Sequence, residues 1–204
     1  GSTAVEQTLQ ALVEKNLVQR RTTSVGARFE LLESTREYAE EKAAGLPESA
    51  ELRSRHAGHY RSLALQGDLG MRGRDQVRWF EILNLDRANI DAALGHFSAT
   101  EQWEAGLEIA DALSWYWYRS GQFPYGLRWL EVFLDRCPDC PSQLRARALH
   151  LKGWLTFVFG DWRTAHALYG ESLYMARRVS DVKSECLALS DLGVAERWLG
   201  NRAR

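Results

Sequence analysis

Two short motifs in this sequence have spacings that suit metal or redox chemistry. Cys137-Pro-Asp-Cys140 has the spacing of a thioredoxin-type dithiol or of half a zinc site, and His56 and His59 fall three residues apart on an expected helix. A redox dithiol needs a βαβ setting, and a zinc site needs further ligands. The sequence indicates neither. We therefore interpret the cysteines as thiols in a loop at a helix end and the histidines as packing or surface residues.

Catalytic and nucleotide-binding motifs are missing from the sequence. No arrangement of serine, histidine and acid indicates an activated nucleophile, and no paired carboxylates stand out from helical surface charge. The phosphate-binding pattern G-x-x-x-x-G-K-[ST] does not occur. We therefore predict that the chain is not an enzyme and that it holds no metal and no cofactor of its own.

The aromatic run Ser114-Trp-Tyr-Trp-Tyr-Arg119 is the strongest candidate for a binding surface. On a helix its four rings cannot share one face. Trp117 falls on the side that should pack against a partner helix. The other side carries charged and aromatic side chains together, namely Glu108, Asp111, Trp115, Tyr118 and Arg119.

The same face recurs in the helices that follow. Its equivalents are Arg147, His150, Trp154 and Phe157 in the next helix and Ser190, Val194 and Arg197 in the last. Tryptophan, tyrosine, arginine and acids together are typical of a surface for an effector or a protein partner. In stacked helix pairs this face should line the concave surface. An alternative stays open, in which the large rings only fill space between widely separated helices.

A repeating glycine motif marks the elements that position these side chains. Gly121-Gln-Phe, Gly160-Asp-Trp and Gly200-Asn-Arg follow one another at nearly equal spacings. An amphipathic helix is expected before each glycine and another after the first two. The expected helices are Glu101–Ser120, Pro124–Arg136, Leu144–Phe159, Trp162–Val179 and Lys183–Leu199. Small residues recur where paired helices must approach closely, for example Gly153, Ser172 and Gly193.

This pattern predicts a stack of helix–turn–helix repeats. It resembles the tetratricopeptide repeat, with Gly153, Gly160, Ala165 and Tyr169 at positions of that family's signature. The resemblance implies a right-handed α-solenoid over residues 101–204, and the third unit holds only its first helix.

The first fifth of the chain has a different pattern. A helical stripe over Thr3–Asn16 precedes two short strands, Leu17–Thr22 and Ala27–Glu33, joined by a polar turn. Ser34-x-x-Glu37 predicts a capping box at the start of a helix that ends near Gly45. Helix, hairpin and helix in this order resemble the C-terminal part of a winged-helix domain, which we assign to residues 1–46.

A helical arm over residues 47–100 should connect the two parts. We expect a helix over Ser49–Gln66, a glycine-rich loop over Gly67–Gly73 and one or two helices over Asp75–Phe97. Strands are therefore expected only in the first fifth, and the predicted class is mainly α.

Two phrases carry a resemblance to a known class of proteins. STAND-class (NB-ARC-type) bacterial transcriptional regulators contain sequences similar to two segments of this chain. The segments are Phe29-Glu-Leu-Leu-Glu-Ser-Thr-Arg-Glu-Tyr-Ala39 and Asp86-Arg-Ala-Asn-Ile-Asp-Ala-Ala-Leu94. The resemblance implies a nucleotide-binding domain elsewhere in the full-length protein, which would hold ATP or ADP and be a partner of this chain. It also implies that the repeats sense an inducer.

In the wider family this segment holds a Met-His-Asp motif, whose histidine contacts the β-phosphate of ADP. The matching positions here are Leu31, Leu32 and Glu33. Leucine donates no hydrogen bond, so this contact is not expected, although Glu33 could still act as an acceptor. Alternatively, the two leucines simply fill the junction between strand and helix.

Charge and composition narrow the remaining possibilities. The 204 residues are 45% hydrophobic and 26% charged, with a net charge of −1. The helix before the hairpin carries Glu6, Glu14 and only Lys15, so direct DNA contact by this chain is not expected. No apolar run approaches the length of a membrane span. Three cysteines without a disulfide framework favour the cytoplasm.

Gly1-Ser2 and the position of Arg204 within a repeat suggest a piece of a longer protein. Two functions therefore stay open: a sensor coupled to a nucleotide switch, and a repeat scaffold for a protein partner without a switch.

Overall fold

The computed structural model describes residues 2–137 and 142–200 and is mainly helical. The chain divides into two compact units, Gly1–Arg55 and His56–Arg204, and each is described by itself. Within the described residues, strands occur only in the first unit, as the sequence pattern predicts. Among the described helices, none combines the length and the hydropathy that a membrane span requires.

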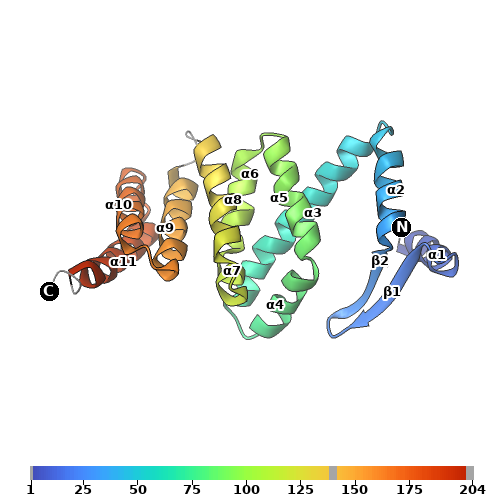
Figure 1. Ribbon diagram of the computed structural model, residues 1–204, viewed down its shortest axis with the longest axis horizontal. Helices are drawn as coiled ribbons and strands as arrows, with labels where there is room; N and C mark the ends of the chain where they lie inside the picture. Colours follow the sequence, from blue (N-terminus) through green and yellow to red (C-terminus); the bar gives the residue numbers. More distant parts are fainter. Residues whose placement is uncertain (1, 138–141, 201–204) are drawn as a thin grey trace. The chain divides into compact units, whose positions relative to one another are not determined.

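The first unit is a helix, a hairpin and a second helix. Its elements are α1 (Ser2–Glu14), β1 (Val18–Thr23), β2 (Gly26–Leu31) and α2 (Glu33–Ala44) (Figure 1). The strands are antiparallel, with Val18 opposite Leu31 and Thr23 opposite Gly26. Gly26 has φ of +127°, which favours glycine at the end of this two-residue turn. The predicted hairpin is confirmed, whereas the winged-helix assignment stays a prediction.

The start of α2 corrects the predicted capping box. The N-cap is Leu32, in extended conformation and without a side-chain cap hydrogen bond. The Arg36 amide donates to the Leu32 carbonyl at 2.8 Å, so the helix begins before Ser34. Ser34 therefore lies inside the first turn and cannot act as the cap. At the other end Gly45 is the C-cap, as predicted.

The second unit is entirely helical in its described part. Helix α3 (Ser49–Met71) crosses the boundary between the units. The helices after it are α4 (Gln76–Leu85), α5 (Arg87–Ala99), α6 (Trp103–Ala112), α7 (Ser114–Ser120), α8 (Phe123–Arg136), α9 (Ser142–Phe159), α10 (Trp162–Arg178) and α11 (Val182–Gly200). The expected helix over Glu101–Ser120 is therefore two helices, α6 and α7, which meet at the buried Leu113.

The predicted loop over Gly67–Gly73 is wrong, because α3 continues to Met71. A Cβ atom at Gly67 would lie 3.0 Å from the Leu83 side chain, and one at Gly70 would overlap the Trp79 ring. These glycines therefore let α4 approach α3 closely. The sequence pattern alone does not distinguish glycine used for close packing from glycine used in a loop.

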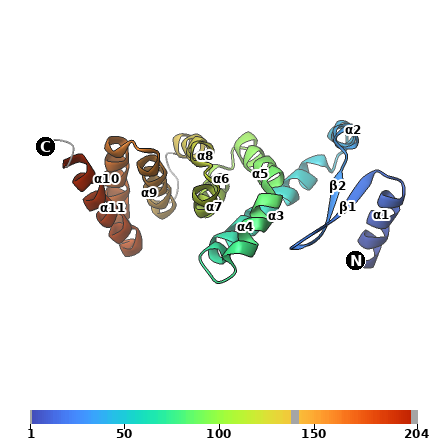
Figure 2. The same cartoon turned by 60° about the horizontal axis from the view of Figure 1, so that its bottom comes forward.

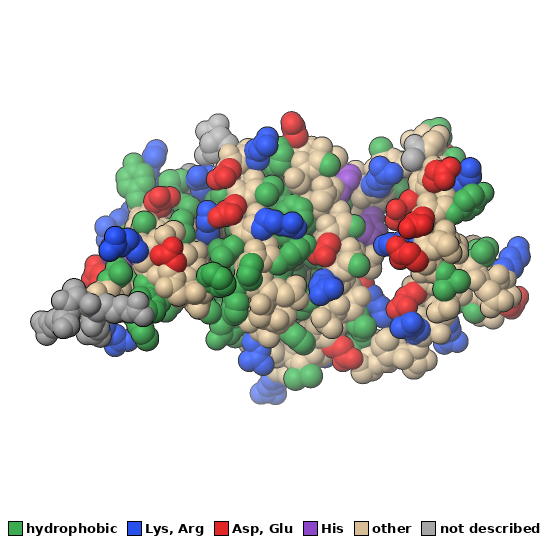
Figure 3. All heavy atoms as spheres, in the orientation of Figure 1, with side chains coloured by type: hydrophobic (Ala, Val, Ile, Leu, Met, Phe, Trp, Pro, Cys, Tyr) green, Lys and Arg blue, Asp and Glu red, His purple; other side chains and the backbone are tan. Residues whose placement is uncertain are grey.

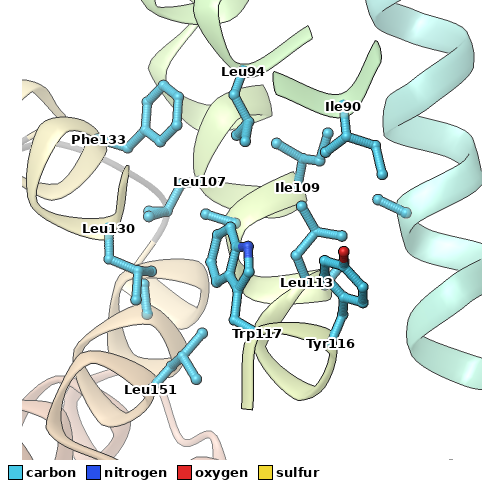
Figure 4. Packing of buried hydrophobic residues seen from close by; sticks show 14 of the residues in the cluster. Ile90, Leu94, Leu107, Ile109, Leu113, Tyr116, Trp117, Leu130, Phe133 and Leu151 are labelled. Carbon is cyan, nitrogen blue, oxygen red and sulfur yellow. The ribbon is translucent and has the colours of Figure 1, made fainter. Parts of the chain in front are cut away.

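The core of the second unit lies between α3, α5, α6, α7, α8 and α9. Figure 4 shows Ile109, Leu113 and Trp117 at its centre, and these three side chains are at most 1% exposed. Trp117 lies against Gly126 of α8, where a Cβ atom would come within 2.5 Å of its ring. The prediction that Trp117 packs against the partner helix is therefore confirmed.

The last helices pack in sequence order. Helix α9 packs against α10 and α10 against α11, and the three lie side by side in both cartoon views (Figure 1; Figure 2). The buried Ser172 hydroxyl donates to the Ala146 carbonyl at 2.7 Å. A Cβ atom at Gly153 would come within 2.8 Å of the Tyr169 ring. The close packing predicted at Gly153 and Ser172 is confirmed, whereas the prediction for Gly193 is wrong, because a Cβ atom there would meet nothing within 4 Å among the described residues. The superhelical form stays a prediction.

Candidate functional site

An aromatic cluster joins α7 and α9. Trp115 and Tyr118 of α7 lie against Trp154 of α9, with ring centroids 6.0 Å and 4.7 Å from that of Trp154. Trp115 and Tyr118 are themselves stacked, 5.1 Å apart. All three rings are half-buried. The structure therefore brings together the three aromatic residues that the sequence assigned to one face of adjacent repeats.

Helix α7 positions these rings because its other side is fixed in the core. Trp117 is buried against α8, so Trp115 and Tyr118 point toward α9 instead. Arg119 is exposed. The indole N–H of Trp115 is buried, and no acceptor among the described residues lies within hydrogen-bond distance. An unsatisfied buried donor costs about 1–3 kcal/mol, so the cluster is not optimised for stability alone.

A charged pair lies beside the rings. Asp111 of α6 and Arg147 of α9 form an ion pair, and the Asp111 side chain is 14% exposed. Burial raises the pKa of Asp111, and the Arg147 guanidinium opposes that shift. Asp68 raises the pKa of Asp111 further, whereas Arg72 lowers it. Asp111 is therefore a nearly buried carboxyl group that depends on arginine neighbours.

Two further polar pairs join other helices. The Arg61 guanidinium of α3 donates to the Glu108 carboxylate of α6, with Nε at 2.6 Å. His150 Nε2 of α9 lies 2.9 Å from a carboxylate oxygen of Asp191 in α11. Sequence reasoning missed Arg61, Asp68, Arg72 and Asp191. The signal that was available is opposite charge one repeat apart, at separations of 36 and 41 residues.

One of the last predicted residues, Phe157, lies in a second aromatic group. Phe157 contacts Trp198, and Trp198 contacts Trp162, with centroids 6.4 Å and 5.1 Å apart. Arg197 is exposed next to Trp198 in the sequence, and Val194 is half-buried. This group joins α9, α10 and α11.

The arrangement separates two kinds of residue within the predicted face. Four polar members bind other protein side chains and so hold helices together, namely Glu108, Asp111, Arg147 and His150. The rings of the α7–α9 cluster are partly exposed. Figure 3 shows hydrophobic side chains gathered in the lower part of the view, in the region of α7 and α8. The rings, together with the exposed Arg119 and Arg197, are therefore the members of the face that a ligand can contact.

Two hollows lie elsewhere in the second unit. They have volumes of about 490 Å³ and 570 Å³, and both are lined by Glu101 and Trp103. Glu108 is the one predicted site residue that lines either of them among the described residues. The rings of the α7–α9 cluster line neither hollow and are partly exposed.

The nucleotide-sensing positions lie in the first unit. Leu31 and Leu32 are 47% and 41% exposed, and the alternative in which they simply fill the junction stays a prediction. Glu33 forms an ion pair with Arg36 in the first turn of α2. That carboxylate is already an acceptor for a neighbour.

The paired histidines show no ligand-binding arrangement. His56 and His59 are exposed and both contact the Tyr60 ring, which agrees with their interpretation as packing or surface residues. Among the described residues, no three His, Cys, Asp or Glu side chains gather as a metal site.

The cysteines differ from one another. Cys137 is disulfide-bonded, so its interpretation as a thiol is wrong. Cys186 is a free, exposed thiol. Cys140 lies outside the described residues.

Comparison with known proteins gives distant relatives. No family model matches the chain. One protein of Mycobacterium bovis and two of Mycobacterium tuberculosis strains, each named "Putative HTH-type transcriptional regulator", are 28% identical over 193 residues. The match covers 91% of this chain and 22% of each relative, so the chain spans about a fifth of their length.

Proposed function

We propose that this chain is the sensor part of a STAND-type (NB-ARC-type) bacterial transcriptional regulator that works in the cytoplasm. Its helical repeats bind an effector or protein partner and report it to a nucleotide-binding domain elsewhere in the same protein. The match to transcriptional regulators along 91% of the chain supports the regulatory role, and the Phe29–Ala39 phrase supports the class. ATP or ADP would bind to the nucleotide domain. This chain would hold no cofactor, catalyse no reaction and make no direct DNA contact.

The observation that carries the proposal is the set of contacts made by α9. Its Trp154 lies against the rings of α7, its Arg147 binds Asp111 of α6, and its His150 binds Asp191 of α11. Because one helix makes all three contacts, a ligand that displaces the rings also strains both polar pairs. Coupling between two sites requires two arrangements of the protein in which the ligand makes different contacts.

The experiment that tests this proposal uses the longest natural polypeptide that contains this chain. After purification, bound nucleotide is released by denaturation and identified by chromatography. The proposal predicts that ADP or ATP is recovered at about one equivalent. Recovery of no nucleotide, together with no binding of added ADP, would contradict it.

A repeat scaffold is a second candidate, and the partly exposed aromatic cluster favours it. Such a scaffold would bind a protein segment through Trp115, Tyr118 and Trp154, and its affinity would not depend on nucleotide. Pull-down of a partner with equal yield in ADP and in ATP would favour the scaffold. A yield that changes with the nucleotide would favour the sensor.

A further inference from the structure

The ion pairs beside the α7–α9 cluster turn their cations outward. In the pair of Arg147 with Asp111, the arginine side chain is 55% exposed and the aspartate side chain 14%. In the pair of Arg72 with Asp68 on α3, the corresponding values are 58% and 23%. Arg72 also lowers the pKa of Asp111, so the two pairs lie close to one another. The surface beside the rings therefore presents guanidinium groups, while the carboxylates lie beneath them.

The opposite order occurs where α8 meets α9. Lys152 of α9 pairs with Glu131 of α8, and there the lysine side chain is 20% exposed and the glutamate side chain 55%. A long basic side chain usually keeps its charged end in water, yet this lysine is the more buried partner. The outward guanidinium groups beside the rings are therefore a property of that surface and not of side-chain length alone.

The helical hydrogen bonds of α6 continue into α7. The amide of Leu113 donates to the Ile109 carbonyl at 3.0 Å, and the amide of Trp117 donates to the Leu113 carbonyl at 2.9 Å. Residues four positions apart therefore stay on one side of the helix across the junction. A rise of about 1.5 Å per residue places such residues about 6 Å apart along the helix axis.

Guanidinium groups flank the rings along this axis. Asp111, which binds Arg147, precedes Trp115 by one turn, and Arg119 follows Trp115 by one turn. Arg119 is exposed. The level of Asp111 and that of Arg119 are therefore about 12 Å apart, with the Trp115 ring midway between them. A ligand on this surface meets a cation, then rings, then a second cation.

We propose that the α7–α9 cluster binds an extended peptide segment of a partner protein, in which one aromatic side chain lies between two acidic ones in the order acid–x–aromatic–x–acid. An extended chain rises about 3.3 Å per residue, and its alternate side chains point to the same face. The two acids of this pattern are therefore about 13 Å apart, which matches the spacing of the cationic positions. The aromatic side chain packs on the rings, and the carboxylates bind Arg147 and Arg119 by charge-assisted hydrogen bonds. This inference rests on the proposed function, because it names the partner of the same site.

The charge and the length of the surface favour this ligand over two others. An aromatic cation would meet the guanidinium groups of Arg147 and Arg119, which repel it. A small aromatic acid with one ring is shorter than the distance between the two arginines, so it would reach only one of them. An acidic peptide complements both charges and the rings at once.

Synthetic peptides test the pattern on the 204-residue chain by fluorescence anisotropy. The test peptide is fluorescently labelled and carries Glu-Ser-Phe-Ser-Glu between neutral ends. In one control both glutamates are glutamines. In the other the phenylalanine is moved by one position, which turns it to the opposite face of an extended chain. We expect each control to bind about fivefold more weakly or worse. Equal affinities for the three peptides, or a Kd for the test peptide above about 1 mM, would overturn the proposal.

Substitution of Arg119 identifies the surface that binds the peptide. Arg119→Gln should weaken the test peptide about threefold to fivefold and leave the glutamine control unchanged, whereas Arg119→Lys should retain most of the affinity. Arg78→Gln is the matched control, because Arg78 is also exposed but lies in α4. Equal effects of Arg119→Gln and Arg78→Gln would show non-specific attraction and overturn the site.

The peptide measurement is independent of the nucleotide measurement that tests the proposed function. It uses the 204-residue chain without nucleotide, so a failure of the peptide to bind contradicts this inference and leaves the recovery of ADP from the longer protein unaffected. Recovery of no nucleotide from the longer protein, together with binding of the test peptide, would contradict the nucleotide switch and retain the peptide site.

Discussion

Asp111 of α6 and Arg147 of α9 form an ion pair that joins two helices across 36 residues of sequence. The carboxylate is nearly buried, at 14% exposed, whereas the arginine is 55% exposed. The pair therefore fixes the distance between the two helices more than it adds stability, since burial of the carboxylate offsets much of the attraction.

Removal of Arg147 should be costly because it leaves Asp111 buried without its partner. We expect Arg147→Ala to lower the free energy of unfolding at pH 7 by about 1–3 kcal/mol, measured by urea denaturation. Asp111→Asn in the same background should recover part of the loss, because an amide is cheaper to bury than an unpaired carboxylate. No recovery in the double variant would show that Arg147 acts through other contacts.

The same pair predicts a pH dependence. The pKa of Asp111 is raised in the folded state, so folding favours its protonated form. The stabilisation of the protonated form is fully present below the unfolded pKa of about 3.9, and it is lost as the pH rises through the folded pKa. Arg147→Ala raises the folded pKa further. The loss of unfolding free energy in this variant should therefore be larger at pH 7 than at pH 4. An equal loss at both pH values would contradict the role of Arg147 as the partner of the Asp111 carboxylate.

Two glycines in adjacent helices offer a matched test of close packing. Gly153→Ala should destabilise the protein by about 1–3 kcal/mol, because the new methyl group meets the Tyr169 ring. Gly170→Ala in α10 should stabilise it by roughly 0.5–1 kcal/mol, because nothing lies within 4 Å of a Cβ atom there. Thermal unfolding of both variants tests this, and effects of the same sign would refute the packing role of Gly153.

Alkaline pH should weaken the contact between α8 and α5. Burial, together with a hydrogen bond of 2.6 Å to Asp91, raises the pKa of Tyr125 to about 12. The neutral phenol is favoured by folding, so its stabilisation is present below pH 10 and is lost as the pH approaches 12. Absorbance titration of phenolate should show a late-ionising tyrosine that disappears in Tyr125→Phe. Tyr116 and Tyr169 also ionise late, because burial raises the pKa of each. A titration curve that is the same in Tyr125→Phe as in the natural sequence would show that Tyr125 is not one of the late-ionising tyrosines.

The N-terminus of α2 should accept a better cap. Leu32 is the N-cap and makes no side-chain cap hydrogen bond. Leu32→Asp should stabilise the helix by about 0.5–1.5 kcal/mol, because its carboxylate can accept from the free amides of the first turn. Hydrogen exchange of the α2 amides measures the effect. Leu32→Asn serves as the uncharged control, and faster exchange in both variants would show that the leucine has a packing role.

The periodicity of the sequence predicts the helical repeats and the hairpin because these depend on local patterns. The repeat marked by Gly121 and Gly160 places Trp115, Tyr118 and Trp154 on one face, and the structure confirms that they meet. Local patterns also mislead where packing decides. The glycines of the Gly67–Gly73 segment look like a loop, but α3 runs through Gly70, because the Leu83 and Trp79 side chains occupy the space that a Cβ atom would need.

The partners of the charged site residues were beyond local reasoning. Arg61 binds Glu108 across 47 residues of sequence, and Asp191 binds His150 across 41 residues. Nothing in the sequence next to Arg61 or Asp191 indicates these contacts. The N-cap of α2 is Leu32, two residues before the predicted Ser34. This difference places Ser34 inside the first turn, where it cannot act as the N-cap.

We propose that the contacts of Trp154 are coupled to a nucleotide-binding domain in the full-length protein. This coupling is tested most directly by the rate of ADP release from that protein, compared between the natural sequence and Trp154→Ala. Val77→Ala is the control, since Val77 is 81% exposed. The account predicts that Trp154→Ala changes the rate on the order of fivefold or more and that Val77→Ala leaves it unchanged. Identical rates in all three proteins, or no bound ADP to release, would contradict it.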